Sequence, residues 1–251
     1  MLRIASVCMA LVLSASFAFA AEDLTGRWDG VVNSSPDQGT ICFSQVPGTC
    51  GDTFISAIIS QLGTVAACGY NPAGGPPARS RAADEFLCNG AVNGLHWWGT
   101  YFNLNGCIPI GAAATFNHIL TLGGTTCPDD AFVFCTLTNV TPIATNTGGD
   151  SWEYRSKFQC PNGIPPGAPI YATVQIRENA FPQWGWTESA QNLVGQPSCL
   201  IAPDFAVNAW TPIGPLVGTP WCGQAFEVQQ AAATPVENST WGEVKSSFYS
   251  N

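Results

Sequence analysis

The side chains best suited to recognition are two tryptophans, Trp184 and Trp186, separated by a single glycine. Residues two apart in a β-strand point to the same face, so these indoles lie side by side. Such a pair forms either a layer of the core or a flat apolar platform on which sugar rings stack. Gln183 and Glu188 flank the pair and can exchange hydrogen bonds with hydroxyl groups. On the platform interpretation these four residues form a glycan-binding site.

Residues for acid–base or nucleophilic catalysis are present, but their pattern is unspecific. His96 and His118 both fall in apolar strand-like runs, and the chain has no G-x-S-x-G nucleophile motif. We therefore expect both histidines to be satisfied in or near the core. Glycosidases use two carboxyl groups that flank the scissile bond. Candidate acids are Asp84, Glu85, Asp129, Asp130, Glu153, Glu178, Glu188 and Asp204. Because 17 acidic residues offer many pairs, we predict no catalytic residue.

Two acidic pairs could bind a structural calcium ion. Asp84-Glu85 and Asp129-Asp130 each place two carboxylates next to each other. Calcium takes about 6–8 oxygen ligands, and carboxylates are common among them. The alternative is that these acids are solvated residues of turns. Structural calcium is thus the one cofactor that the sequence suggests.

The cysteines indicate disulfides. The chain has 11, and an even number, ten, follows the N-terminal segment. These ten are Cys42, Cys50, Cys68, Cys88, Cys107, Cys127, Cys135, Cys160, Cys199 and Cys222. An even count in an exported chain is typical of paired cysteines. Zinc does not fit, because no C-x-x-C occurs and the two histidines lie far apart. A turn at residues 46–48 makes Cys42–Cys50 the expected local pair.

The N-terminal residues and the charge balance indicate where the protein works. Arg3 precedes an apolar run, Ile4–Leu13, and Ala18-Phe19-Ala20 fits a signal-peptidase site. We predict a signal peptide over residues 1–20 and a secreted protein, extracellular or at the cell surface. The run is shorter than the roughly 20 residues of a membrane helix, and no second run follows, so we expect no membrane span. With 8 basic against 17 acidic residues, no nucleic-acid partner is expected.

Strand-like runs dominate the rest of the chain. Helical signals are scarce, because 26 glycines and 19 prolines interrupt the sequence. Short runs between turns predict an all-β sandwich of jelly-roll type. The runs are Arg27–Val32, Val92–Phe102, Ala114–Leu122, Ala131–Leu137, Trp152–Gln159, Ile170–Arg177, Phe205–Trp210 and Ala225–Gln229. Thr53–Ala67 is either a short helix or a strand.

One segment suggests a domain boundary. Asn71–Ala78 is rich in proline and glycine and cannot form regular structure. We predict an N-terminal extension over residues 21–78, a sandwich domain over 79–230, and a linker with a strand-like tail over 231–251. About 50 residues rarely hold a core alone, so Trp28 and Val32 should pack on the sandwich.

Several strand motifs form a pattern that resembles a known group of domains. In order they are Ala83-Asp84-Glu85-Phe86, Trp97-Trp98-Gly99-Thr100-Tyr101, Trp184-Gly185-Trp186 and Ala225-Phe226-Glu227. They resemble the ADDF, WWGxY, WGW and AFE strands of exported bacterial jelly-roll-like sandwich domains, which are similar to carbohydrate-binding modules. The resemblance implies a two-sheet sandwich and a binding role. Glu85 departs from it, because aspartate is usual at that position.

These features together predict a secreted, non-catalytic binding or adhesion module, with a glycan or cell-surface material as its partner. The alternatives are a carbohydrate-active hydrolase that uses a carboxylate pair and a structural coat or matrix protein. A deep cleft with two facing carboxyl groups would favour the hydrolase. An exposed aromatic strip without such a pair would favour the binding module, and a surface with neither feature would favour the structural role.

Overall fold

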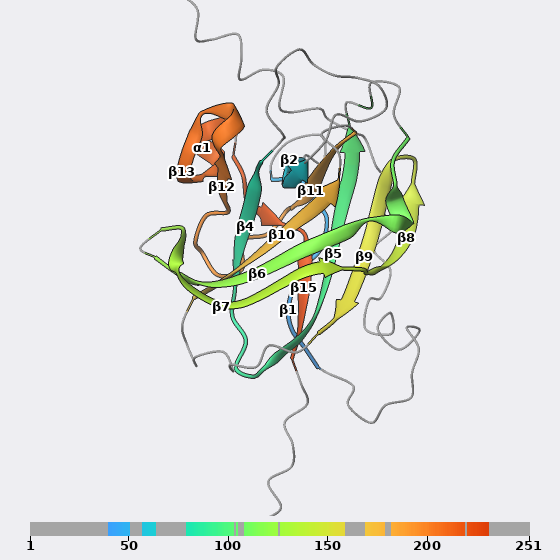
Figure 1. Cartoon of the computed structure of the whole chain (residues 1–251). Helices are drawn as coiled ribbons and strands as arrows, with labels where there is room; N and C mark the ends of the chain where they lie inside the picture. The colour runs from blue at the N-terminus through green and yellow to red at the C-terminus, as the bar shows by residue number, and fades with distance from the viewer. Residues whose placement is uncertain are drawn as a thin grey trace, which may run out of the picture.

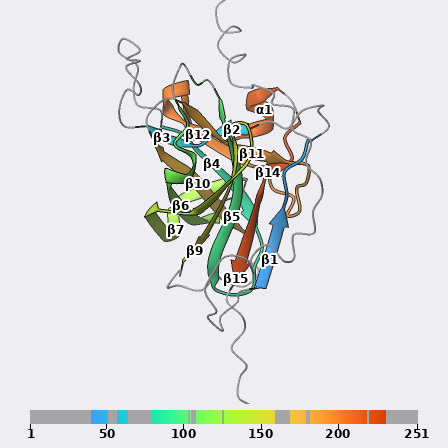
Figure 2. The same cartoon turned by 90° about the vertical axis from the view of Figure 1, so that its right-hand side faces the viewer.

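Strand-forming runs of the sequence assemble into two β-sheets that pack face to face (Figure 1, Figure 2). The computed structural model describes residues 40–50, 57–63, 79–102, 104, 108–124, 126–158, 169–178, 182–218 and 220–230. Within these ranges the helices are short: α1 (Ile213–Val217) and two 3-10 turns, Gly111–Ala113 and Pro203–Phe205. The predicted all-β, jelly-roll-like, disulfide-rich sandwich is confirmed. The predicted signal peptide, Trp28, Val32 and the tail 231–251 lie outside the described residues.

The first sheet is organised by its longest strand, β5. Its order is β1-β15-β5-β11-β14, β9 also pairs with β5, β8 pairs with β9, and β2 pairs with β11. Strands β15 and β11 follow each other along one edge of β5, and β9 pairs with the other edge. The bounds are β1 Thr40–Gln45, β2 Ala57–Ile59, β5 Val92–Phe102, β8 Ile143–Gly148, β9 Ser151–Lys157, β11 Gln183–Ser189, β14 Gly223–Gln224 and β15 Phe226–Gln230.

The second sheet follows the order β13-β12-β4-β10-β6-β7, with β3 also paired to β10. Its described neighbours are antiparallel, apart from β3, which runs parallel to β10. The bounds are β3 Gln61–Gly63, β4 Arg81–Phe86, β6 Thr115–Gly123, β7 Pro128–Val140, β10 Ile170–Glu178, β12 Cys199–Ala202 and β13 Val207–Pro212.

The described part of the predicted N-terminal extension belongs to both sheets. Strand β1 pairs with β15, and β2 pairs with β11, both in the first sheet. Strand β3 pairs with β10 in the second sheet. The ambiguous run Thr53–Ala67 thus forms two strands over its described part, and residue 78 marks no boundary in the sheet topology.

Aromatic side chains fill the space between the sheets. Trp97 on β5 and Trp184 on β11 both meet Phe116 on β6 edge-to-face, with ring centroids 4.9 and 5.3 Å apart. Tyr154 on β9 stacks on Trp97 at 5.7 Å. These four rings are fully buried. Since side chains alternate along a strand, His96 and Trp98 must point away from this core.

Disulfides connect distant parts of the chain. The bonds between described cysteines are Cys42–Cys88, Cys50–Cys222 and Cys127–Cys199. Cys135 is also disulfide-bonded, while Cys68, Cys107 and Cys160 lie outside the described residues. The expected pair Cys42–Cys50 is wrong. The chain is extended from Cys42 to the end of β1 and rises about 3.3 Å per residue. The turn that follows therefore begins farther from Cys42 than the roughly 7 Å between Cα atoms that a disulfide can span.

The disulfides also bear on the protein's surroundings. Such bonds persist in oxidising environments and are rare where thiols are kept reduced, so they indicate an extracellular type of environment. Among the described residues, no helix has the length and apolar character needed to cross a membrane.

Candidate functional site

The predicted platform residues Trp184 and Trp186 lie inside the protein, with no exposed surface. Trp184 packs over Gly99, where a Cβ atom would come within 2.1 Å of the indole. Trp186 donates its Nε1–H to the carbonyl oxygen of Ala225 at 2.9 Å. The face of β11 that both indoles share is turned toward the second sheet. They form a core layer, and the exposed platform does not occur.

The two polar residues of the predicted site do not form a surface with the tryptophans. Gln183 directly precedes Trp184 in β11, so its side chain points to the opposite face. Glu188 is 1% exposed and pairs across the strands with Gln224. The four predicted binding residues are neighbours in β11, but they are not brought together at an accessible surface.

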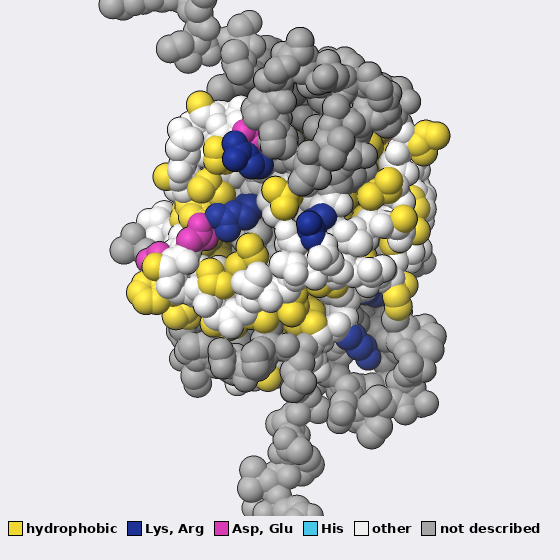
Figure 3. Space-filling model, in the orientation of Figure 1, with side chains coloured by type: hydrophobic (Ala, Val, Ile, Leu, Met, Phe, Trp, Pro, Cys, Tyr) yellow, Lys and Arg dark blue, Asp and Glu magenta, His cyan; other side chains and the backbone are white. Residues whose placement is uncertain are grey.

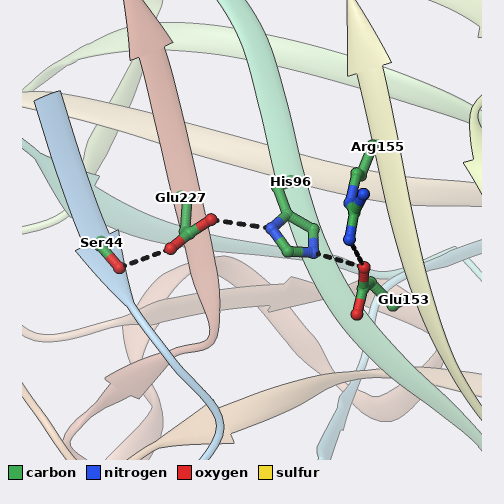
Figure 4. Close-up of polar contacts among 5 residues, drawn as sticks. All are labelled: Ser44, His96, Glu153, Arg155 and Glu227. Atoms are coloured by element: carbon green, nitrogen blue, oxygen red, sulfur yellow. Dashed lines mark hydrogen bonds and ion pairs between the residues drawn. The ribbon is translucent and has the colours of Figure 1, made fainter. Parts of the chain in front are cut away.

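A buried charged network crosses four strands of the first sheet (Figure 4). His96 on β5 donates its Nδ1–H to Glu227 Oε2 on β15 at 2.8 Å, and its Nε2 lies 3.4 Å from Glu153 Oε1 on β9. Ser44 on β1 donates its hydroxyl to Glu227 Oε1 at 2.7 Å. Arg155 on β9 forms an ion pair with Glu153. Each of these polar side chains thus has a partner on a neighbouring strand or on the same strand.

The network has the residue types of a catalytic site but lacks access. His96 is fully buried, and Glu153 and Glu227 are each 2% exposed. A substrate must contact the acid and the base that act on it, within hydrogen-bond distance or through one water. Because these side chains are buried, a glycosidic bond cannot reach the carboxylate pair of Glu153 and Glu227. The network instead connects the strands β1, β15, β5 and β9.

The second histidine is also part of the interior, as expected from the sequence. His118 on β6 lies edge-to-face with Trp97 at 4.7 Å, and its Nε2 is 3.3 Å from Ser156 Oγ. Burial lowers the pKa of His118 to about 3, so the ring is neutral at physiological pH. Both histidines are fully buried, as expected of residues in or near the core, His118 between the sheets and His96 on the other face of the first sheet, although His118 Nδ1 has no hydrogen-bond partner among the described residues.

Asp84 on β4 is the hydrogen-bond centre between the two sheets. Its Oδ2 accepts from Gln45 Nε2 at 2.9 Å and from the Gln224 N–H at 2.7 Å. Its Oδ1 accepts from Ser198 Oγ and from the Glu85 N–H, both at 3.0 Å. Burial raises the pKa of Asp84 to about 7, against the opposing effect of these four donors. The carboxyl group therefore joins β1, β4, β14 and the loop before β12.

Glu85 points away from Asp84, because adjacent strand residues face opposite sides of a sheet. It is 2% exposed, and its Oε2 is buried without a hydrogen-bond partner. Burial raises the pKa of Glu85 to about 7. The two carboxyl groups therefore lie on opposite faces of β4 and do not converge on one site.

The remaining candidate acids are also dispersed. Asp129 at the start of β7 accepts from the Ala131 N–H, while Asp130 and Asp204 form ion pairs with Arg81 and Arg79. The Glu178 side chain lies outside the described residues. In the described ranges, no three His, Cys, Asp or Glu side chains gather where they could hold a metal ion.

The raised pKa of Glu85 should make the stability of the fold depend on pH. Its folded pKa of about 7 lies above its ordinary value of 4.5. The folded state therefore binds more protons between these pH values, and the free energy of unfolding falls as the pH rises through this window. Glu85→Gln should raise the free energy of unfolding at pH 8 by on the order of 2 kcal/mol and leave it nearly unchanged at pH 4.

Urea unfolding at both pH values measures this, with Asp150→Asn as the control for the loss of one acid in a turn. Equal declines from pH 4 to pH 8 in the wild type and in Glu85→Gln would show that folding does not raise the pKa of Glu85.

An accessible pocket of about 240 Å³ lies over β3, β4, β10 and β12. It is lined by Leu62, Arg79, Ser80, Arg81, Gln175, Ile201 and Pro203. Leu62, Ile201 and Pro203 supply apolar surface. The polar groups include the guanidinium of Arg79, whose side chain is 56% exposed. Figure 3 shows basic side chains on the face that carries these strands, next to acidic ones.

Fixed partners hold the arginines of this pocket. Arg81 donates to both carboxylate oxygens of Asp130, at 2.6 and 3.4 Å, and its guanidinium lies 5.1 Å from the centre of the Trp210 ring. Arg79 donates to Asp204 Oδ1 at 3.3 Å through Nη2 and to Oδ2 at 2.6 Å through its backbone N–H. Each guanidinium has five N–H donors, so these pairs leave further donors on Arg79 and Arg81, which line the pocket.

The pocket residues have no local signature in the sequence. Arg79 and Arg81 share a face of the chain because they are two apart, which is the one signal that could have singled them out. Leu62, Gln175 and Ile201 come from three other strands, and strand pairing brings them together. Glu227 of the buried network was missed for the same reason.

Comparison with known proteins identifies no relative of this chain. No protein-family model matches the chain, and no curated protein is significantly similar to it. The resemblance to exported bacterial sandwich domains therefore rests on the order of the strand motifs, and the site rests on the geometry of the pocket.

Proposed function

We propose that this protein is a secreted, non-catalytic binding module whose ligand is a glycan, held at the pocket that Arg79, Ser80, Arg81 and Gln175 line. The observation that carries the proposal is the composition of this pocket, which combines apolar side chains with arginine, serine and glutamine. Sugar rings combine an apolar C–H face with hydroxyl groups that both donate and accept. Such a ligand matches a pocket lined by Leu62 and Ile201 together with charged, planar side chains.

The size of the pocket limits what it can enclose. Pockets that bury drug-sized ligands have volumes of about 300–1,000 Å³. A volume of about 240 Å³ falls below this range, so one ring or one end group of a longer ligand fits inside. The rest of a polysaccharide would extend over the neighbouring sheet face.

The enclosed carboxylates support a non-catalytic role. Glu153 and Glu227, which flank His96, are both 2% exposed, and Asp84 is 3% exposed. The carboxylates nearest the pocket, Asp130 and Asp204, are engaged by Arg81 and Arg79. Hydrolysis of a glycoside needs a free acid and a free base on either side of the bond.

A filled pocket tests this proposal. An array of immobilised polysaccharides first identifies the saccharide that the wild type binds. Ile201→Phe adds bulk to the pocket wall and should weaken the affinity for this saccharide by about tenfold or more. Leu193→Phe is the matched control, since Leu193 is 56% exposed and does not line the pocket.

Titration calorimetry with the retained saccharide gives the affinities. The proposal fails if the wild type retains no saccharide, or if Ile201→Phe binds as tightly as Leu193→Phe while both are folded by circular dichroism.

A further inference from the structure

Arg177 on β10 is a charged side chain without a partner. Each of the other described arginines, Arg79, Arg81 and Arg155, forms an ion pair with a carboxylate. Among the described residues the Arg177 side chain has neither a hydrogen bond nor an ion pair, although the residue is half-buried. A guanidinium that has lost part of its water without gaining a counter-ion favours the approach of an anion.

The strand register places Arg177 beside the pocket. Gln175, two residues earlier in β10, lines the pocket, so the Arg177 side chain points to the same face of the sheet. In the parallel pair of β10 and β3, Arg177 lies opposite Leu62, which also lines the pocket. Arg177 therefore stands at the rim of the pocket, next to Leu62.

Arg79 stands on the other side of the same leucine. Leu62 forms an isolated antiparallel bridge with Arg79. Neighbouring strands are about 4.8 Å apart, so the backbones of Arg79 and Arg177 are roughly 10 Å apart with Leu62 between them. Long side chains that start at this spacing can converge on one group above the leucine.

Among the described side chains that line or border the pocket, one cation is not matched by an ion pair. Arg79 and Arg81 are balanced by Asp204 and Asp130, and Arg177 is unbalanced. This unmatched cation stands out in a chain of 8 basic and 17 acidic residues, whose net charge of −9 otherwise repels anions. The local charge is therefore specific to this rim.

We propose that the ligand is an acidic saccharide, and that Arg177 and Arg79 bind its carboxylate or sulfate group while the sugar ring rests on Leu62. This inference rests on the proposed glycan-binding function and narrows it. Arginine suits both anions, because its planar fork of N–H donors matches two oxygens at once.

The test compares three probes of similar chain length: oligogalacturonate, which carries carboxylates, dextran sulfate, which carries sulfates, and neutral dextran. Binding to the mature protein is measured by titration calorimetry at about 50 and 200 mM salt. We expect one of the two acidic probes to bind at least about tenfold more tightly than dextran, with an affinity that falls as salt rises. Which acidic probe binds identifies the anion.

Charge variants locate the contact. Arg177→Gln should weaken binding of the acidic probe by about tenfold or more. Lys157→Gln removes the same charge from an exposed position on β9, in the other sheet, and should have little effect. Arg177→Lys keeps the charge without the planar fork and should give an intermediate affinity, provided that all variants unfold at the wild-type temperature.

The outcomes separate this inference from the function on which it rests. If dextran binds as well as the acidic probes and Ile201→Phe weakens that binding, the protein binds glycans and the acidic ligand is refuted. Equal losses in Arg177→Gln and Lys157→Gln would refute the contact, because binding would then follow net charge. If the polysaccharide array and all three probes show no binding, both proposals fall.

Discussion

Replacing Asp84 with alanine is expected to lower the free energy of unfolding by about 3–5 kcal/mol. The buried carboxyl group accepts four hydrogen bonds, from Gln45, Ser198 and the backbone N–H groups of Glu85 and Gln224. Hydrogen bonds to charged groups contribute about 1.5–3 kcal/mol each, and a buried donor left without an acceptor costs about 1–3 kcal/mol. Urea unfolding followed by tryptophan fluorescence measures the loss.

Asp84→Asn is the control that retains the shape of the side chain. Its amide oxygen can still accept from Ser198 and Glu85, but its NH₂ group would face two other donors, Gln45 Nε2 and the Gln224 N–H. An intermediate loss is expected. If Asp84→Ala proves as stable as the wild type, Asp84 is not the group that joins the two sheets.

Trp184→Ala is expected to destabilise the protein by about 3–5 kcal/mol and to leave saccharide binding by the folded fraction unchanged. The indole is fully buried between Gly99 and Phe116, so its removal leaves a cavity in the core. The alternative from the sequence, a recognition platform, predicts the reverse: unchanged stability and lost binding. Chemical unfolding and titration of the same protein samples distinguish the two.

Phe132→Ala is the matched control for the loss of an aromatic ring. Phe132 lies on β7 and is 57% exposed, so its removal should change the free energy of unfolding by less than about 0.5 kcal/mol. A loss of binding in Trp184→Ala without a loss of stability would restore the platform interpretation.

Local sequence patterns predicted the strands that have strong apolar runs. Val92–Phe102 matches the bounds of β5, and Ile170–Arg177 ends one residue before β10 does. Strand β8, Ile143–Gly148, was missed because its polar residues are mostly exposed and show no alternation. Alternation of apolar and polar residues identifies a strand that has one buried face. It is absent from a strand whose two faces are both exposed to solvent.

The candidate site was not predictable in the same way. The period of two places Trp184 and Trp186 on one face, but it does not say whether that face meets the core or the solvent. The second sheet decides this by packing on that face, where Phe116 on β6 lies against Trp184. Likewise, Arg177 and Arg79 become neighbours only through Leu62, and no property of the three residues indicates that β3 runs between them.

The pairing of β1 with β15 has a consequence for how the chain reaches this fold. The two strands lie side by side in Figure 2, yet Ser44 and Glu227, which bond across them, are 183 positions apart. Contacts so distant along the chain form slowly, because a long loop must close before they stabilise anything. During translation β1 is synthesised early and β15 is among the last strands, so the pairing of β1 and β5 with β15 forms late. Until then, the edge of β5 that pairs with β15 over Val92–Trp97 stays open, although β9 can already pair with the other edge, and an unpaired strand edge is open to association with other chains.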